Sequence, residues 1–308
     1  MMLTLIMSFR NLKNTFTLIT EKVKNNECYT KEWKNFCVIA KNLEKNPPVQ
    51  LQAIHNILNR LKKKMNKKKI SILDHGCGSG MTVIYLAVLG YTKIHGINVN
   101  FDVDFLNNIL RDRIKIKKKR IFTTDGKKVP FNNEYFDFII SAQVLEHLRE
   151  DEIFLYYEEE GRILKKNGFA YHELPHKFIP YESHSRLWII HLFPYFMKPF
   201  LYGLFMSIRD KKNLFLKGSY YADFFSKEFL ILRSPQFHKK MIRKNIGEFE
   251  DLTVQRLSKK TDFSSYDTDS PLFLRKLIQK FFLIPLAGKV LIFFLKNFFI
   301  LQTISTKN

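Results

Sequence analysis

The stretch ISILDHGCGSG, residues 70–80, decides the fold of this 308-residue chain. A short apolar run ends in Asp74, and three glycines follow at alternate positions. A helical pattern of apolar residues begins directly after the last of these glycines. Glycine lets the backbone approach a ligand closely, and the free N–H groups of a helix N-terminus favour an anionic group. A buried strand, a tight turn and a helix start therefore predict a nucleotide-type binding site.

The spacing of the glycines narrows the choice of nucleotide. A dinucleotide fingerprint carries Gly or Ala three residues after its second glycine, and Met81 occupies that position. The stretch instead resembles motif I of the class I S-adenosylmethionine (SAM)-dependent methyltransferases, in which an acid closes the first strand ahead of G-x-G-x-G. This resemblance implies that Asp74 holds the amino group of the cofactor. It also implies that Gly76, Cys77 and Gly78 lie against the methionine moiety.

Two later strand ends extend the resemblance to the rest of the cofactor. The expected second strand, residues 93–98, ends in Asn98, where the family has an acid that accepts from both ribose hydroxyls. An amide offers one acceptor oxygen and a two-proton donor, so ribose contact is kept without charge-assisted strength. Asp125 and Gly126 follow the expected third strand, and VPF at 129–131 completes a match to the family's D-x-x-x-L-P-F segment. In that segment the acid accepts from the adenine amino group.

The segment EYFDFIISAQVLEHL, residues 134–148, is the second specific match. Ser141 and Gln143 fall at the carboxyl end of the expected fourth strand, where open α/β sheets bind ligands. We therefore expect both at the cofactor. Glu146-His147 matches the V-L-E-H segment of the methyltransferase type 11 family. In that family His147 either handles substrate or a proton, or is a structural hydrogen-bonding residue, and both alternatives stay open.

After about residue 175 the resemblance thins. The segment 175–196 resembles an insertion found in a subset of these enzymes, often in glycan or lipid-linked pathways. Glu182 and His184 stand at its E-x-H positions, directly after the strand that borders the methyl group. With His147 they are the candidate catalytic residues, as a general base for an acceptor hydroxyl or amine. The nearby histidines show no recognised metal-ligand spacing, so no metal site is expected.

The net charge and the amino-acid composition indicate which classes of binding partner the protein favours. The formal net charge is +22, which suits an anionic partner but also follows from the lysine bias of an AT-rich genome. The N-P-P-[YF] string of amino-methylating nucleic-acid enzymes is absent after the fourth strand, so nucleic acid is disfavoured as a partner. Three cysteines form neither an even framework nor a metal pattern, which favours a reduced, cytoplasmic protein.

The C-terminal region is apolar from Phe281 to Leu301, and Lys289 and Lys296 fall on one helical stripe that Thr303 continues. This pattern predicts an amphipathic helix at an anionic membrane surface, on its inner face. Packing of this helix on its own domain and a true membrane span are the alternatives. The sequence also predicts a helix over 224–246 that begins at a Ser226 cap, and an antiparallel strand within 249–257.

Together these features predict a Rossmann-like, doubly wound α/β sheet of seven strands, with the last strand antiparallel and helical additions at both ends. The expected organisation is an N-terminal helical cap (1–66), a SAM-binding core (67–257) with an apolar insertion at about 175–221, and a linker and C-terminal helix (258–308). The expected activity is SAM-dependent methyl transfer to a small-molecule, glycan or lipid-linked acceptor. A nucleic-acid methyltransferase and an inactive SAM-fold module are the alternatives.

Overall fold

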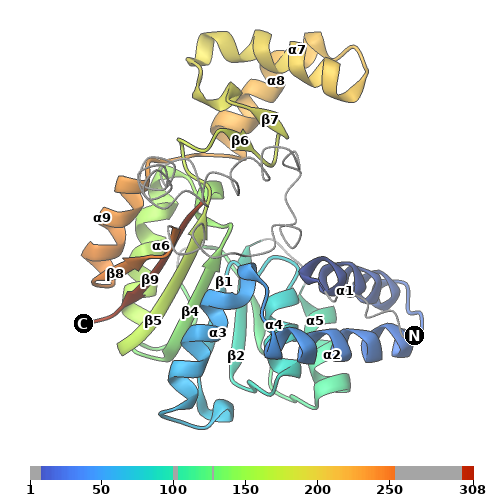
Figure 1. The fold of residues 1–308 in the computed structure, drawn as a ribbon, viewed down its shortest axis with the longest axis vertical. Coiled ribbons are helices and arrows are strands. Elements are labelled where there is room, and N and C mark those ends of the chain that lie inside the picture. The colour runs from blue at the N-terminus through green and yellow to red at the C-terminus, as the bar shows by residue number, and fades with distance from the viewer. Residues whose placement is uncertain (1–7, 100–102, 127, 254–299) are drawn as a thin grey trace, which may run out of the picture.

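The computed structural model describes residues 8–99, 103–126, 128–253 and 300–308, and its centre is one seven-stranded sheet (Figure 1). The strand order is β3-β2-β1-β4-β5-β9-β8. β1 to β5 pair in parallel, whereas β9 runs antiparallel to both β5 and β8. The predicted sheet is confirmed, and its strands are β1 Ile72–His75, β2 Ile94–Val99, β3 Ile121–Thr124, β4 Phe136–Ala142, β5 Leu164–Leu174, β8 Phe249–Asp251 and β9 Leu301–Thr306.

Helices cover the sheet on both faces (Figure 1). Successive strand residues point to opposite faces, so Ile72 joins the apolar cluster of the N-terminal helices while Leu73 joins a second cluster with Ile139 and Ile163. The predicted helical segment before β1 forms three helices whose apolar stripes belong to the first cluster. The helices that cover the sheet are α3 Val49–Lys62, α4 Met81–Val88, α5 Asp104–Ile109, α6 Glu150–Ile163 and α9 Pro235–Asn245. α1 Phe9–Lys24 and α2 Thr30–Lys45 lie further out, where α1 contacts α5 and α2 contacts α4.

The predicted helix over 224–246 was wrong. Residues Phe224–Glu228 are a π-helical turn that continues α8 (Gly218–Asp223), and α9 begins only at Pro235. Ser234 caps α9 by accepting from the N–H of Phe237 at 3.2 Å. A Ser N-cap followed by Pro at the first helical position is a stronger start signal than a serine alone. The hydroxyl of Ser226 instead accepts from Lys198 at 3.1 Å.

The C-terminus ends in a strand. Most of the predicted C-terminal helix lies outside the described residues, but Leu301 and Thr303, which were expected to continue it, belong to β9. Leu301 pairs with Leu174, and Thr306 pairs with Phe169. Five of the six β9 residues are buried, and neighbouring strands pair with both edges of β9. The helix was therefore wrong for these residues.

The insertion after β5 forms a separate lobe above the carboxyl ends of the strands (Figure 1). A two-stranded hairpin, β6 Tyr181–Glu182 and β7 Leu187–Trp188, leads into α7 Lys198–Asp210 and then α8. A Cβ on Gly218 would collide with the carbonyl oxygen of Pro199, so glycine allows the two helices to approach closely. Among the described residues, no helix is long and apolar enough to cross a membrane.

Candidate cofactor and acceptor site

Left-handed glycines build the turn between β1 and α4. Gly76 has φ +87° and Gly78 has φ +49°. The N–H groups of Gly76 and Cys77 donate to the carbonyl oxygen of Ile97 at 2.9 and 2.8 Å, which fastens the turn to β2. A Cβ on Gly76 would collide with Val144, whereas a Cβ on Gly78 would meet nothing within 4 Å. Gly78 is therefore the point of the turn at which a ligand can approach the backbone.

Asp74 lies at the end of β1, immediately before this turn. Its side chain is 5% exposed, and among the described residues it has no hydrogen-bond or ion-pair partner. Burial raises the pKa of Asp74 to about 7. An isolated buried carboxylate is costly, and it becomes favourable when a cationic group reaches it. The residue therefore fits the role that the sequence predicts, which is to hold an ammonium group.

The neighbouring strand ends place Asn98 and Asp125 at the same edge of the sheet. β1, β2 and β3 are adjacent and parallel, so their carboxyl ends lie side by side. The side-chain amide of Asn98 is directed at the carbonyl oxygen of Gly78, 3.4 Å away. Asp125 is exposed at the end of β3, and Gly126 follows with φ +79° and donates its N–H to Thr124 Oγ1 at 3.3 Å. The structure thus brings the predicted ribose residue against the glycine turn.

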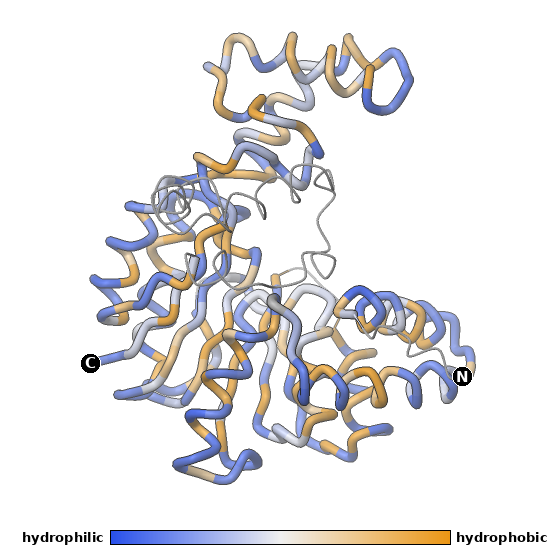
Figure 2. The backbone as a smooth tube through the Cα atoms, viewed as in Figure 1, coloured by the Kyte–Doolittle hydropathy of each residue, from blue (hydrophilic) through white to orange (hydrophobic). Residues whose placement is uncertain are grey.

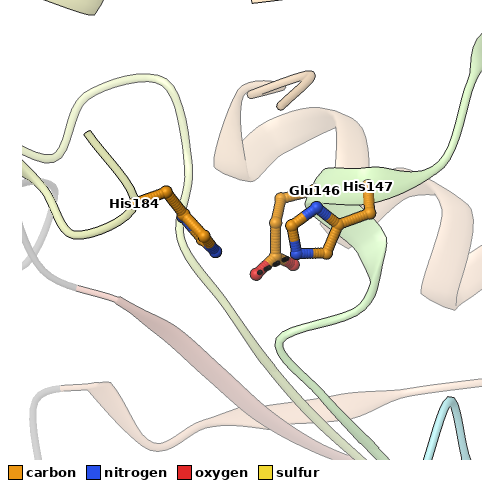
Figure 3. Close-up of side chains that lie close together, drawn as sticks. All are labelled: Glu146, His147 and His184. Carbon is orange, nitrogen blue, oxygen red and sulfur yellow. Dashed lines mark ion pairs between the residues drawn. The ribbon is translucent and has the colours of Figure 1, made fainter. Parts of the chain in front are cut away.

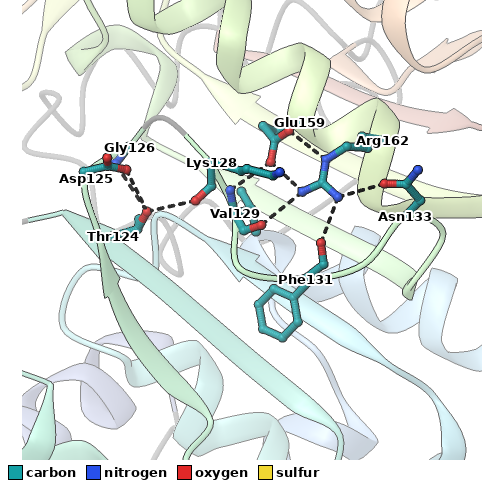
Figure 4. Close-up of polar contacts among 9 residues, drawn as sticks. All are labelled: Thr124, Asp125, Gly126, Lys128, Val129, Phe131, Asn133, Glu159 and Arg162. Atoms are coloured by element: carbon teal, nitrogen blue, oxygen red, sulfur yellow. Dashed lines mark hydrogen bonds and ion pairs between the residues drawn. The ribbon is translucent and has the colours of Figure 1, made fainter.

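A single arginine on α6 holds the loop that follows β3 (Figure 4). Arg162 donates to the carbonyl oxygens of Val129 and Phe131 at 3.0 and 2.8 Å, and to Asn133 Oδ1 at 2.9 Å. It also pairs with Glu159 at 2.6 Å, and Glu159 accepts the N–H of Val129 at 2.8 Å. The sequence analysis did not predict these contacts, because no sequence spacing relates Arg162 on α6 to the loop between β3 and β4.

A buried polar network lies beneath the strand ends. Ser141 is 1% exposed, and its Oγ lies 2.8 Å from the hydroxyl of Tyr156. Glu160 is fully buried between His75 at 3.2 Å and His172 at 2.7 Å. Although burial raises the pKa of Glu160, the two histidines outweigh burial and lower the pKa to about 2. Ser141 thus accepts from Tyr156 in the interior of the domain, and its predicted contact with the cofactor stays a prediction.

Gln143 lies at the turn after β4. Its backbone has φ +58°, and its N–H donates to the carbonyl oxygen of Glu173 at 2.8 Å. Unlike Ser141, Gln143 has an exposed side chain. It is therefore placed where a ligand at the strand ends can reach it.

The three predicted catalytic residues come together between η3 (Leu145–His147) and the β6–β7 hairpin, and Figure 3 shows two of them, His147 and His184. The rings of His147 and His184 meet edge to face, with centroids 5.1 Å apart. His147 Nδ1 lies 2.7 Å from the carbonyl oxygen of Phe229. Glu182 is 1% exposed, and its Oε1 accepts from both the N–H and Nδ1 of His184 at 2.7 Å. Burial lowers the pKa of His184, but Glu182 more than compensates and the pKa is raised overall.

Glu146 joins this cluster, although the sequence prediction gave it no role. Its side chain is 1% exposed, and neither carboxylate oxygen has a hydrogen-bond partner. Burial raises the pKa of Glu146 to about 7. Nε2 of His147 lies 3.9 Å from Oε1 (Figure 3). The only sequence signal for Glu146 is its place in the V-L-E-H segment.

Comparisons with known proteins give one match to a family model and several distant similarities to solved structures. Residues 73–172 match the family model described as a methyltransferase domain. Among solved structures, the chain is similar to a geranyl diphosphate methyltransferase in complex with SAM, with 13% identity over 78% of this chain and 77% of that one and a TM-score of 0.41. It is also similar to the [4+2]-cyclase SpnF, with 15% identity over 77% and 73% and a TM-score of 0.40.

A geranyl diphosphate C-methyltransferase from Streptomyces coelicolor A3(2) shows 13% identity over 78% of this chain and 71% of that one, with a TM-score of 0.40. Similarities at this level carry no information about substrate. A search of curated proteins finds no match to the chain. The matched residues, 73–172, run from β1 through most of β5 and include the glycine turn. Over these residues the chain therefore matches the methyltransferase type 11 domain, which the glycine turn and the strand ends resemble in sequence.

Proposed function

We propose that this protein binds SAM at the carboxyl ends of β1, β2 and β3 and transfers its methyl group to a small-molecule, glycan or lipid-linked acceptor. The observation that carries the proposal is the buried, unpartnered carboxylate of Asp74 beside the open face of Gly78. SAM supplies an ammonium group for this carboxylate and a sulfonium-activated methyl group. Because the methyl group arrives activated, the work of the protein is to hold acceptor and methyl group in line.

The remaining strand ends account for the rest of the cofactor. The backbone of the turn would lie against the methionine moiety at Gly78, where no neighbouring atom lies within 4 Å of an added Cβ. Asn98 would accept from one ribose hydroxyl, and Asp125 with Gly126 would meet the adenine amino group. Arg162 supports this last contact indirectly, because it fixes the loop that begins just after Gly126.

The lobe after β5 supports an acceptor with an apolar part. It exposes a group of large hydrophobic side chains, and Leu216 is 94% and Phe196 is 80% exposed. Figure 2 shows apolar segments along this lobe, which projects above the strand ends. Exposed apolar patches of this kind mark binding surfaces more often than ordinary solvent-facing surface. Basic residues at 209, 211, 212 and 217 are also exposed in the lobe, which suits an acceptor that joins an apolar chain to an anionic group.

The test of SAM binding compares two arginine substitutions at left-handed positions. Gly78→Arg should abolish binding of SAM and of its demethylated product in calorimetry, because the side chain would occupy the open face of the turn. Asn167→Arg is the matched control, since Asn167 is exposed with φ +60° and lies near the start of β5, away from its carboxyl end. Binding that survives Gly78→Arg would refute this cofactor site. Absence of binding to the unaltered protein at millimolar SAM would refute the activity.

The acceptor is tested separately. Purified protein with radiolabelled SAM should label the lipid-linked or small-molecule fraction of a cell extract, and Gly78→Arg should remove that label. Label found only in nucleic acid would refute the acceptor class while leaving methyl transfer intact.

A further inference from the structure

Three side chains at the boundary between the strand ends and the β6–β7 hairpin point toward one another with nitrogen and oxygen atoms that can bind a metal ion (Figure 3). One ligand atom from each of Glu146, His147 and His184 lies within 4.8 Å of the other two. Glu146 and His147 come from the turn after β4, and His184 comes from the hairpin loop after β5. The cluster thus joins two segments that are far apart in the sequence, at the carboxyl ends of adjacent strands.

The hydrogen bonds of the two rings determine which nitrogen is left for a ligand. A carbonyl oxygen only accepts, so Nδ1 of His147 must carry the proton that it gives to Phe229. Nδ1 of His184 likewise faces the carboxylate of Glu182. In the neutral rings the Nε2 atoms then hold the free lone pairs. Histidines that bind metals almost always donate their other N–H to a carbonyl or carboxylate in this way.

Glu146 provides the second, independent observation. Its carboxylate is buried, both oxygens are unpartnered by hydrogen bonds, and no lysine or arginine among the described residues forms an ion pair with it. A buried carboxylate without donors is unfavourable unless a cation neutralises it. Glu182 differs, because it is satisfied by the two N–H groups and the ring of the 184–185 segment.

We propose that Glu146, His147 and His184 bind a divalent transition-metal ion such as Zn²⁺, with Glu182 as the positioning residue for His184. Two imidazoles and one carboxylate suit such an ion and are a poor set for Mg²⁺, which prefers oxygen ligands. Three protein ligands leave an open position, as in catalytic zinc sites. Tetrahedral ligand atoms at zinc–ligand distances of 2.0–2.1 Å are about 3.3 Å apart, so the cluster must contract by no more than ~1.5 Å.

The chemistry of this site rests on the proposed methyl transfer. An ion here would lie where the lobe meets the strand ends, and it would lower the pKa of an acceptor hydroxyl that binds to it. In the transfer the sulfonium C–S bond breaks and the new O–C bond forms. The hydroxyl proton is released to water, and the demethylated cofactor leaves as a neutral thioether.

Metal binding is measured on the full chain after chelation and dialysis, with Zn²⁺ in calorimetry and Co²⁺ in visible absorption. We expect one ion per chain, and a loss of at least 100-fold in affinity in both His147→Ala and His184→Ala. Glu182→Gln should weaken binding 10–100-fold, as is usual for residues that orient a ligand. His191→Ala is the matched control, since His191 lies in the same insertion but outside the cluster. Should the two histidine variants bind Zn²⁺ as tightly as the control, the site would be disproved.

Two further comparisons separate this inference from the proposed function. Gly78→Arg should lose SAM and keep Zn²⁺, whereas His184→Ala should lose Zn²⁺ and keep SAM, which also shows that it folds. If a histidine variant does not fold, Glu146→Gln, which nearly preserves shape, should still change the Co²⁺ spectrum. SAM binding without saturable Zn²⁺, or binding of Mg²⁺ alone, would overturn the metal site and leave the cofactor site standing.

Discussion

Replacing Asp74 by Asn should stabilise the cofactor-free protein at alkaline pH while removing its response to SAM. Burial moves the pKa of Asp74 from 3.8 to about 7. Between these values the folded protein holds a proton that the unfolded chain has released, so this residue lowers stability as pH rises through that window. At about 1.4 kcal/mol per pK unit, the cost above pH 7 reaches about 4 kcal/mol. An amide carries no such cost.

Urea unfolding at two pH values measures this effect. The variant should exceed the natural protein in unfolding free energy by up to about 4 kcal/mol at pH 8 and by less than about 2 kcal/mol at pH 5. Asp137→Asn is a control with the opposite expectation. Asp137 is also buried, but its carboxylate accepts from the N–H of Ser71 and from Lys165, both at 2.8 Å. Replacing this carboxylate by an amide should therefore lower the unfolding free energy at pH 8.

The same samples test ligand linkage. SAM at 100 times its dissociation constant should stabilise the natural protein by about 2.7 kcal/mol, and it should stabilise Asp74→Asn far less. A variant that is less stable than the natural protein at pH 8 would show that Asp74 has an internal partner. A variant that responds to SAM like the natural protein would show that the carboxylate does not hold the ammonium group.

Two other predictions concern the ribose contact and the C-terminal strand. Asn98→Asp should tighten SAM binding by about 1 kcal/mol in calorimetry, because a carboxylate accepts from both ribose hydroxyls. This gain outweighs the loss of the weak 3.4 Å contact between the Asn98 amide and the carbonyl oxygen of Gly78. Unchanged or weaker binding would place Asn98 away from the ribose. A chain that stops at Ile300 should show no cooperative unfolding by circular dichroism, because it lacks β9. In β9 the residues Thr303 and Ser305 are fully buried, and the strand lies between β5 and β8. A shortened chain that folds and binds SAM would contradict this prediction.

The sequence was sufficient to predict the parallel strands of the core, because the patterns that indicate them lie within single short segments. Apolar runs that end in glycine turns predict parallel buried strands, and the expected third strand, 121–124, coincides with β3. The positions of Asp74, Asn98 and Asp125 at successive strand ends followed from the same pattern. Their contacts with SAM remain predictions. Where two local signals competed, as at Ser226 and Ser234, the sequence interpretation took the weaker one and placed the helix too early.

By itself the sequence determined the glycine turn and the order of elements from β1 to β5, because each depends on residues within one short segment. The tertiary structure decided the rest. LQTIST, 301–306, follows a long apolar stretch and has no strand boundary of its own, so only the exposed edges of β5 and β8 make it a strand. Likewise, no spacing links Glu146 and His147 to His184. They become neighbours because β4 and β5 are adjacent and parallel, which brings the loops after their carboxyl ends to the same point.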